Sequence, residues 1–112
     1  MTPHARRDQA RIEFPPASGP QLQTSGRTFE ILDLSTGGLR FRANRLPAGS
    51  VTAGDVLRGI IHFRPGKTVE VRGKILRVSK GQVAARLDIG VPFETILEER
   101  HYPPRRRSGM VW

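Results

Sequence analysis

The sequence predicts a mainly β protein, a small antiparallel barrel, closed or split, of about six strands with a short C-terminal helix. Apolar residues make up only 37% of the 112 residues, while 12 glycines and 9 prolines indicate many turns. Between these turn residues lie short runs in which apolar and polar residues alternate, as they do in half-buried strands. A chain of this length suits one core, so we expect a single domain.

The N-terminal part shows little regular pattern. Residues 1–11 are polar and carry three arginines, and we expect them to form a mobile arm. In residues 12–26 the adjacent Pro15 and Pro16 cannot donate ladder hydrogen bonds, so any strand there is short or lies at a sheet edge. The weak alternation over residues 21–24 marks the best position for such a strand.

A hairpin is predicted next. Its first strand, Arg27–Leu34, changes phase after Ile31, which indicates a bulge just before the turn. Its second strand, Leu39–Ala43, alternates an apolar face with a basic one. The stretch between them, Asp33-Leu34-Ser35-Thr36-Gly37-Gly38, combines turn-forming glycines with closely spaced hydrogen-bonding groups.

Three further strands follow a loop, over Val56–Arg64, Thr68–Ser79 and Val83–Ile89. The interior Gly73 marks the bend that a curved or closed sheet requires, and the alternation changes phase at Leu76. The side chains expected on the inward face are Leu57, Gly59, Ile61, Phe63, Val69, Val71, Ile75, Val83, Ala85, Leu87 and Ile89.

A short helix is predicted after Pro92 and is ended by two prolines at 103 and 104. We therefore expect an arm over 1–11, a barrel with a closing helix over 12–102, and a disordered basic tail over 103–112. The helix is expected to present one apolar face and one acidic face: Phe93, Ile96, Leu97 and His101 on the first, and Glu94, Glu98 and Glu99 on the second.

The chain is strongly basic, with a formal net charge of +9 and 16 arginines among 19 basic residues. Residues 27–90 contain 12 basic and 5 acidic side chains, so +7 of this charge belongs to the predicted barrel. Because the planar guanidinium fork suits phosphates and guanine edges, the bias points to a nucleotide or phosphate partner. A GC-rich genome would produce the same bias.

Several function classes are disfavoured. The chain has no cysteine, hence no disulfide framework and no thiolate zinc site. It shows no secretory signal and no apolar run long enough to span a bilayer, so the expected location is the cytoplasm. Its three histidines are scattered, and no nucleophile, carboxylate pair or phosphate-binding loop has a catalytic spacing. We expect no enzyme and no cofactor.

Two motifs carry a family resemblance. Arg7-Asp8-Gln9-Ala10-Arg11 is an R-x-x-x-R, and 21 residues later Asp33–Gly38 is a D-x-S-x-x-G. The first is expected by chance in so arginine-rich a chain, whereas the second is rarer and more informative. In this order, ahead of a series of strands and a closing helix, the motifs resemble those of the PilZ domain, a bacterial receptor module for cyclic di-GMP.

The resemblance implies a site for this guanine dinucleotide. Arg7 and Arg11 would wrap the ligand from the arm, and Asp33, Ser35 and Gly38 would offer a surface on the barrel. Arginine can bind guanine O6 and N7 in a bidentate manner, and a carboxylate accepts from guanine N1 and N2. Three further residues are candidates: Arg6, whose position in the family favours an intercalated ligand dimer, together with Gly37 and Arg40. The protein would act through a downstream partner protein of unknown identity.

Other interpretations stay open. One alternative is that the turn motif caps only its own backbone, and the outward Arg40 and Arg42 form either a basic patch or an ordinary solvated strand face. A small basic barrel can bind RNA or DNA, here with Arg40, Arg42, Arg72 and Lys74 as a phosphate track, although the aromatics fall mostly on inward faces. A third possibility is a PilZ-like adaptor that binds protein without a nucleotide.

Overall fold

A computed structural model describes residues 11–15, 18–43, 50–64 and 66–100. The predicted roles of Arg6, Arg7, His101 and the tail fall outside these described residues. Within these ranges, seven strands precede one helix: β1 (Ile12–Glu13), β2 (Gln21–Thr24), β3 (Arg27–Ser35), β4 (Gly38–Arg42), β5 (Val56–His62), β6 (Thr68–Ser79), β7 (Gln82–Ile89) and α2 (Phe93–Arg100).

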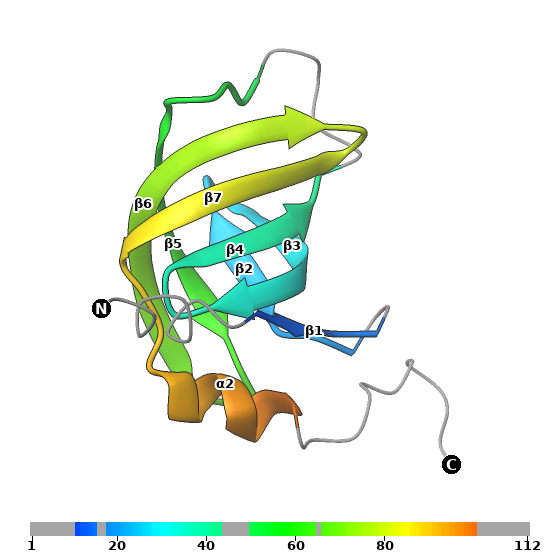
Figure 1. The fold of residues 1–112 in the computed structure, drawn as a ribbon, viewed down its shortest axis with the longest axis vertical. Coiled ribbons are helices and arrows are strands. Elements are labelled where there is room, and N and C mark those ends of the chain that lie inside the picture. Colours follow the sequence, from blue (N-terminus) through cyan, green and yellow to red (C-terminus); the bar gives the residue numbers. More distant parts are fainter. Residues whose placement is uncertain (1–10, 16–17, 44–49, 65, 101–112) are drawn as a thin grey trace, which may run out of the picture.

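The strands form a closed antiparallel barrel (Figure 1). Its order is β3-β2-β5-β6-β7-β4, and β4 pairs back with β3 to complete the ring of six strands. The two-residue β1 pairs with the C-terminal end of β3, where Ile12 lies opposite Leu34. The predicted fold class is confirmed in its closed form, and the strands between residues 12 and 26 are short, as expected from the prolines.

Bulges set which side chains enter the barrel. In the β3–β4 pairing the register shifts between Ile31 and Asp33, where the sequence predicts a bulge. A second shift lies between Arg72 and Gly73 in the β6–β7 pairing, and an added Cβ at Gly73 would overlap the Arg86 carbonyl oxygen. Because side chains alternate along a strand, such a shift changes the face of the residues beyond the extra residue on the bulged strand.

The core fills the barrel with side chains from every long strand. Ile89 departs from the expected inward pattern, because the shift at Gly73 places it opposite the outward Arg72, where it is 54% exposed. The core residues are Phe14, Leu22, Ile31, Leu34, Leu39, Phe41, Leu57, Ile61, Phe63, Val71, Ile75, Val83, Ala85, Leu87, Val91 and Ile96.

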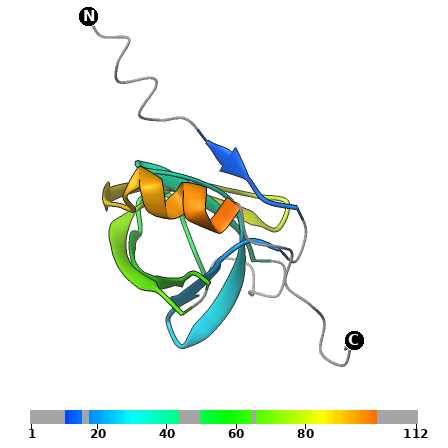
Figure 2. The ribbon, with the colours of Figure 1, turned by 90° about the horizontal axis from the view of Figure 1, so that it is seen from below.

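Helix α2 lies across one end of the barrel (Figure 2) and inserts Ile96 into the core. The predicted division of its faces holds for Ile96, Glu94 and Glu98 but is wrong at two positions, since Phe93 is exposed and Glu99 is buried. The physical reason is Arg64, just past β5, whose Nε lies 3.0 Å from Glu99 Oε2 and whose backbone N–H donates to Oε1 at 2.9 Å. This pair draws a carboxylate to the inner face.

Helix α2 can be compared with the length and apolar character that a membrane-spanning helix needs. Within the described ranges, no helix has the length and apolar character that a bilayer crossing requires.

Candidate functional site

The turn between β3 and β4 is held tightly against β7. Ser35 and Gly38 face each other across the turn, and the Gly37 carbonyl accepts a 2.9 Å hydrogen bond from the Leu87 backbone N–H. Gly90 passes so close to the Thr36 carbonyl oxygen that an added Cβ would overlap it. The turn therefore has a fixed position relative to β7, and a ligand bound at it would contact a rigid element.

Asp33 is placed on the outer face of the barrel by the bulge. Leu34 pairs with Leu39 in the core, so Asp33 and its cross-strand partner Arg40 share the opposite face. Without the register shift, the carboxylate would follow Ile31 into the apolar interior, where an ionised group is very costly. Here the bulge has a chemical consequence, because it places a carboxylate on the outer side of the barrel beside the turn, where arginine side chains can pair with it.

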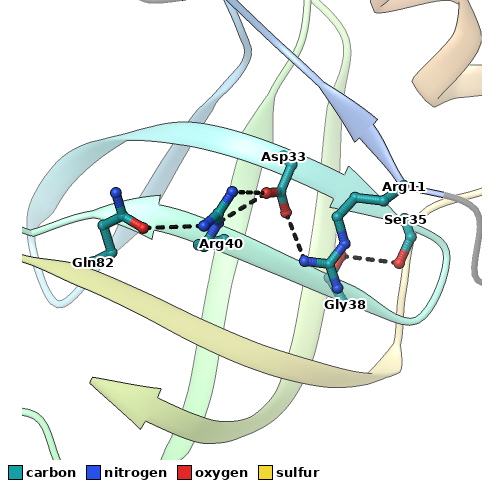
Figure 3. A network of polar contacts seen from close by, with 6 residues as sticks. All are labelled: Arg11, Asp33, Ser35, Gly38, Arg40 and Gln82. Atoms are coloured by element: carbon teal, nitrogen blue, oxygen red, sulfur yellow. Dashed lines mark hydrogen bonds and ion pairs between the residues drawn. The ribbon is translucent and has the colours of Figure 1, made fainter. Parts of the chain in front are cut away.

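Two arginines neutralise the Asp33 carboxylate (Figure 3). Arg40 donates to Oδ2 through Nε at 2.8 Å and through Nη2 at 2.6 Å, and Arg11 donates to Oδ1 through Nη1 at 3.2 Å. The Asp33 side chain is 0% exposed, whereas Arg11 and Arg40 are partly open to solvent. The cluster carries a net positive charge with guanidinium groups facing outward, as suits an anionic or guanine-bearing ligand.

Ser35 and Gly38 complete the turn. Ser35 is buried, and its hydroxyl points toward the Gly38 carbonyl oxygen at 3.4 Å, a long and weak hydrogen bond. A Cβ added at Gly38 would lie 3.2 Å from the Ala85 carbonyl oxygen, so the backbone here passes close to β7. The side chain of Asp33 bonds to arginines rather than to its own turn, which goes beyond a simple capping role.

The structure brings five of the eight sequence-predicted site residues into one cluster: Arg11, Asp33, Ser35, Gly38 and Arg40 (Figure 3). Gly37 lies in the same turn, with its carbonyl bonded to Leu87. Arg6 and Arg7 lie outside the described residues.

One residue of the cluster was missed. Gln82, at the start of β7, accepts a 3.2 Å hydrogen bond from Arg40 Nη1. Nothing in the local sequence distinguishes it, because its role follows from the register of β4 against β7.

The solvated-face interpretation of Arg40 and Arg42 is corrected by their partners. Arg40 binds Asp33, and Arg42 Nε lies 3.3 Å from Glu30 Oε1. Both side chains are therefore engaged within the hairpin, because β3 supplies an acidic residue near each of them. A phosphate track that uses this pair would have to break two ion pairs.

Surface hollows flank the cluster. A cavity of about 190 Å³ is lined by Glu13, Phe14, Leu32, Arg40, Arg42 and Gln82. Another of about 320 Å³ is lined by Arg40, Arg77, Ser79, Lys80, Gln82 and Ala84. Arg40 and Gln82 stand between the two, so a ligand at the turn would have room along the outer face of β4 and β7. In the described part of the chain, histidine and acidic side chains gather into no metal-binding group of three or more.

Comparison with known proteins agrees with this architecture. The family model of the PilZ domain matches residues 5–102. The crystal structure of Legionella uncharacterized protein Lpg0364 is similar in fold, with a TM-score of 0.51 and 11% sequence identity over 70% of this chain and 76% of that one. No sequence among curated proteins matches significantly.

Proposed function

This chain belongs to the PilZ domain family, and from that premise we propose that it is a receptor for cyclic di-GMP that signals to a partner protein. The observation that carries the proposal is the cluster of Arg11 and Asp33 beside the turn that holds Ser35 and Gly38. Residues 22 positions apart meet there, and they are the residue types that read a guanine edge and a phosphate.

Asp33 gives the site its guanine selectivity in this proposal. A carboxylate accepts from guanine N1 and N2, whereas adenine offers no such pair of donors. Both Asp33 oxygens are bonded to arginines and the side chain is 0% exposed, so guanine can reach the carboxylate only if at least one guanidinium moves away. Arg11 is the better leaving partner, because its side chain is about half exposed and its contact is longer than that of Arg40. Once released, Arg11 can stack on the base or bind a phosphate.

The arm supplies the signalling step. Arg11 immediately precedes β1, and β1 pairs with β3 directly beside Asp33. A ligand that moves Arg11 therefore acts on the strand that joins the arm to the barrel. Ordering of residues 1–11 over the ligand would cost conformational entropy and would change the surface offered to a partner. In this scheme the protein acts as an adaptor rather than an enzyme, and its expected location is the cytoplasm.

The alternatives predict different behaviour. A nucleic-acid-binding barrel would lose affinity steeply with salt and would be indifferent to Asp33. Its proposed track is weakened, since Arg40 and Arg42 are paired with acidic residues. An adaptor that binds protein without nucleotide would give no heat with cyclic di-GMP, although its motifs would be intact.

Isothermal titration calorimetry with cyclic di-GMP tests the proposal. The wild type should give a saturable heat, and Arg7→Ala and Arg11→Ala should abolish it while thermal unfolding stays near the wild-type value. Arg42→Ala is the matched control, because this arginine lies on the same hairpin but pairs with Glu30. Binding that survives both arm substitutions would show that the site is wrong, and so would equal loss in the control.

A further inference from the structure

Four basic side chains gather on the outward face of β5, β6 and β7. Arg58 lies directly opposite Arg72, and Lys74 directly opposite Arg86, in neighbouring rows of the sheet. All four are exposed, and among the described residues none forms an ion pair. Like charges that face each other across strands destabilise a sheet. The arrangement is therefore unfavourable for the protein alone and becomes favourable when an anionic partner lies over it.

Apolar groups border these cations. Val56, opposite Lys74, is 61% exposed, and Ile89, opposite Arg72 at the end of β7, is 54% exposed. A hollow of about 540 Å³ adjoins them, lined by Arg58, Arg72, Ile60, Ile89, Glu70 and the β2–β3 turn. Basic groups thus border a hollow whose lining is partly polar and partly apolar and contains a single carboxylate, Glu70. A segment that carries both acidic and apolar side chains matches this chemistry.

This basic face also continues from the candidate site. Arg86 lies opposite Gly38 in the β4–β7 register, so one row of residues runs from the turn through Arg86 to Lys74. The hydrogen bond from Leu87 to Gly37 joins the same two elements. The turn and the basic face are therefore joined directly by backbone contacts.

We propose that the outward face formed by Arg58, Arg72, Lys74 and Arg86 is the docking surface for an acidic segment of a protein partner. The choice of a protein as the occupant rests on the proposed function. A protein is also favoured over single-stranded nucleic acid, which needs aromatic side chains for stacking. Three of the described phenylalanines, Phe14, Phe41 and Phe63, are buried, and the exposed Phe93 belongs to α2.

Fluorescence anisotropy with a short labelled peptide of alternating glutamate and valine tests this surface in the full chain without cyclic di-GMP. Failure of docking is therefore distinguishable from failure of ligand binding, which is measured separately by calorimetry. The acidic peptide should bind and the glutamine-for-glutamate peptide should not. Absence of binding by the acidic peptide would overturn the proposal.

Charge reversal locates the binding surface. Arg72→Glu should weaken peptide binding about tenfold or more, whereas Arg100→Glu, an equal charge change at an exposed position on α2, should leave it within about twofold. Arg72→Glu also places a carboxylate opposite Arg58, so its melting temperature should stay level or rise. Equal losses in both variants would overturn the proposal. Tighter binding of a single-stranded oligonucleotide or of anionic vesicles, lost in Arg72→Glu, would also overturn it and assign the face to that partner instead.

Discussion

The ion pair between Arg64 and Glu99 holds the closing helix against the barrel. The substitution Glu99→Gln removes the negative charge of this pair. The Glu99 side chain is 0% exposed and that of Arg64 is 16% exposed. Arg64 Nη2 also donates to the Ser18 carbonyl at 2.9 Å, so three segments meet at this guanidinium: α2, the end of β5, and the link from β1 to β2.

The expected cost follows from burial. Removing one partner of a buried ion pair costs ~3–5 kcal/mol, because the other charge is left without compensation. Arg64 keeps the Ser18 carbonyl and some solvent contact, and glutamine keeps an oxygen for the Arg64 backbone N–H, so we expect about 2–3 kcal/mol. A small domain loses about 4–8 °C per kcal/mol, so this lowers the melting temperature by roughly 10–20 °C.

Thermal unfolding followed by circular dichroism measures the effect, and the neighbouring residue provides the control. Glu98 is 67% exposed and its Oε1 lies 4.0 Å from Lys67 Nζ, a surface contact. Glu98→Gln should therefore change stability by less than ~1 kcal/mol. Equal melting temperatures for the two variants would refute the assignment of Glu99 as a buried anchor.

Four other substitutions test the barrel and its turn. Gly73→Ala should lower the urea midpoint, with a cost of roughly 1–3 kcal/mol or more, because its Cβ would overlap the Arg86 carbonyl; an unchanged midpoint would contradict the close approach. Ile75→Ala should cost ~2–5 kcal/mol and the adjacent Leu76→Ala less than ~0.5 kcal/mol, since the first side chain is buried and the second exposed; similar costs would contradict this difference in burial. Gly38→Ala should keep the fold, since its Cβ contact is tight but not overlapping, yet weaken cyclic di-GMP binding in calorimetry; unaltered affinity would remove Gly38 from the site.

Local pattern predicted the features that depend on neighbours along the chain. The alternation of Leu57, Ile61 and Phe63 is confirmed by their burial, and the phase change after Ile31 is confirmed as a bulge. Gly73 was recognised as a bend because a glycine inside a strand has few other uses. The closed barrel follows from these elements together.

Features that depend on distant partners were beyond the sequence. Glu99 is buried because Arg64, 35 residues earlier, meets it at the end of the barrel. Arg40 pairs with Asp33 only through the bulged register. Gln82, which follows Arg40 by 42 residues in the sequence, joins them from β7. Helical periodicity or residue type alone cannot reveal such contacts, since they are fixed by how strands align in three dimensions.

The most direct test of the central claim is to locate the ligand on the protein. In two-dimensional nitrogen–proton NMR spectra, addition of cyclic di-GMP should shift the backbone amide resonances of residues 33–38 and of Arg11. The amide resonances around Arg58 and Arg72, on β5 and β6, should shift little. Shifts confined to those β5–β6 rows, or no shifts at tens of micromolar ligand, would contradict a guanine site built on Asp33 and the β3–β4 turn.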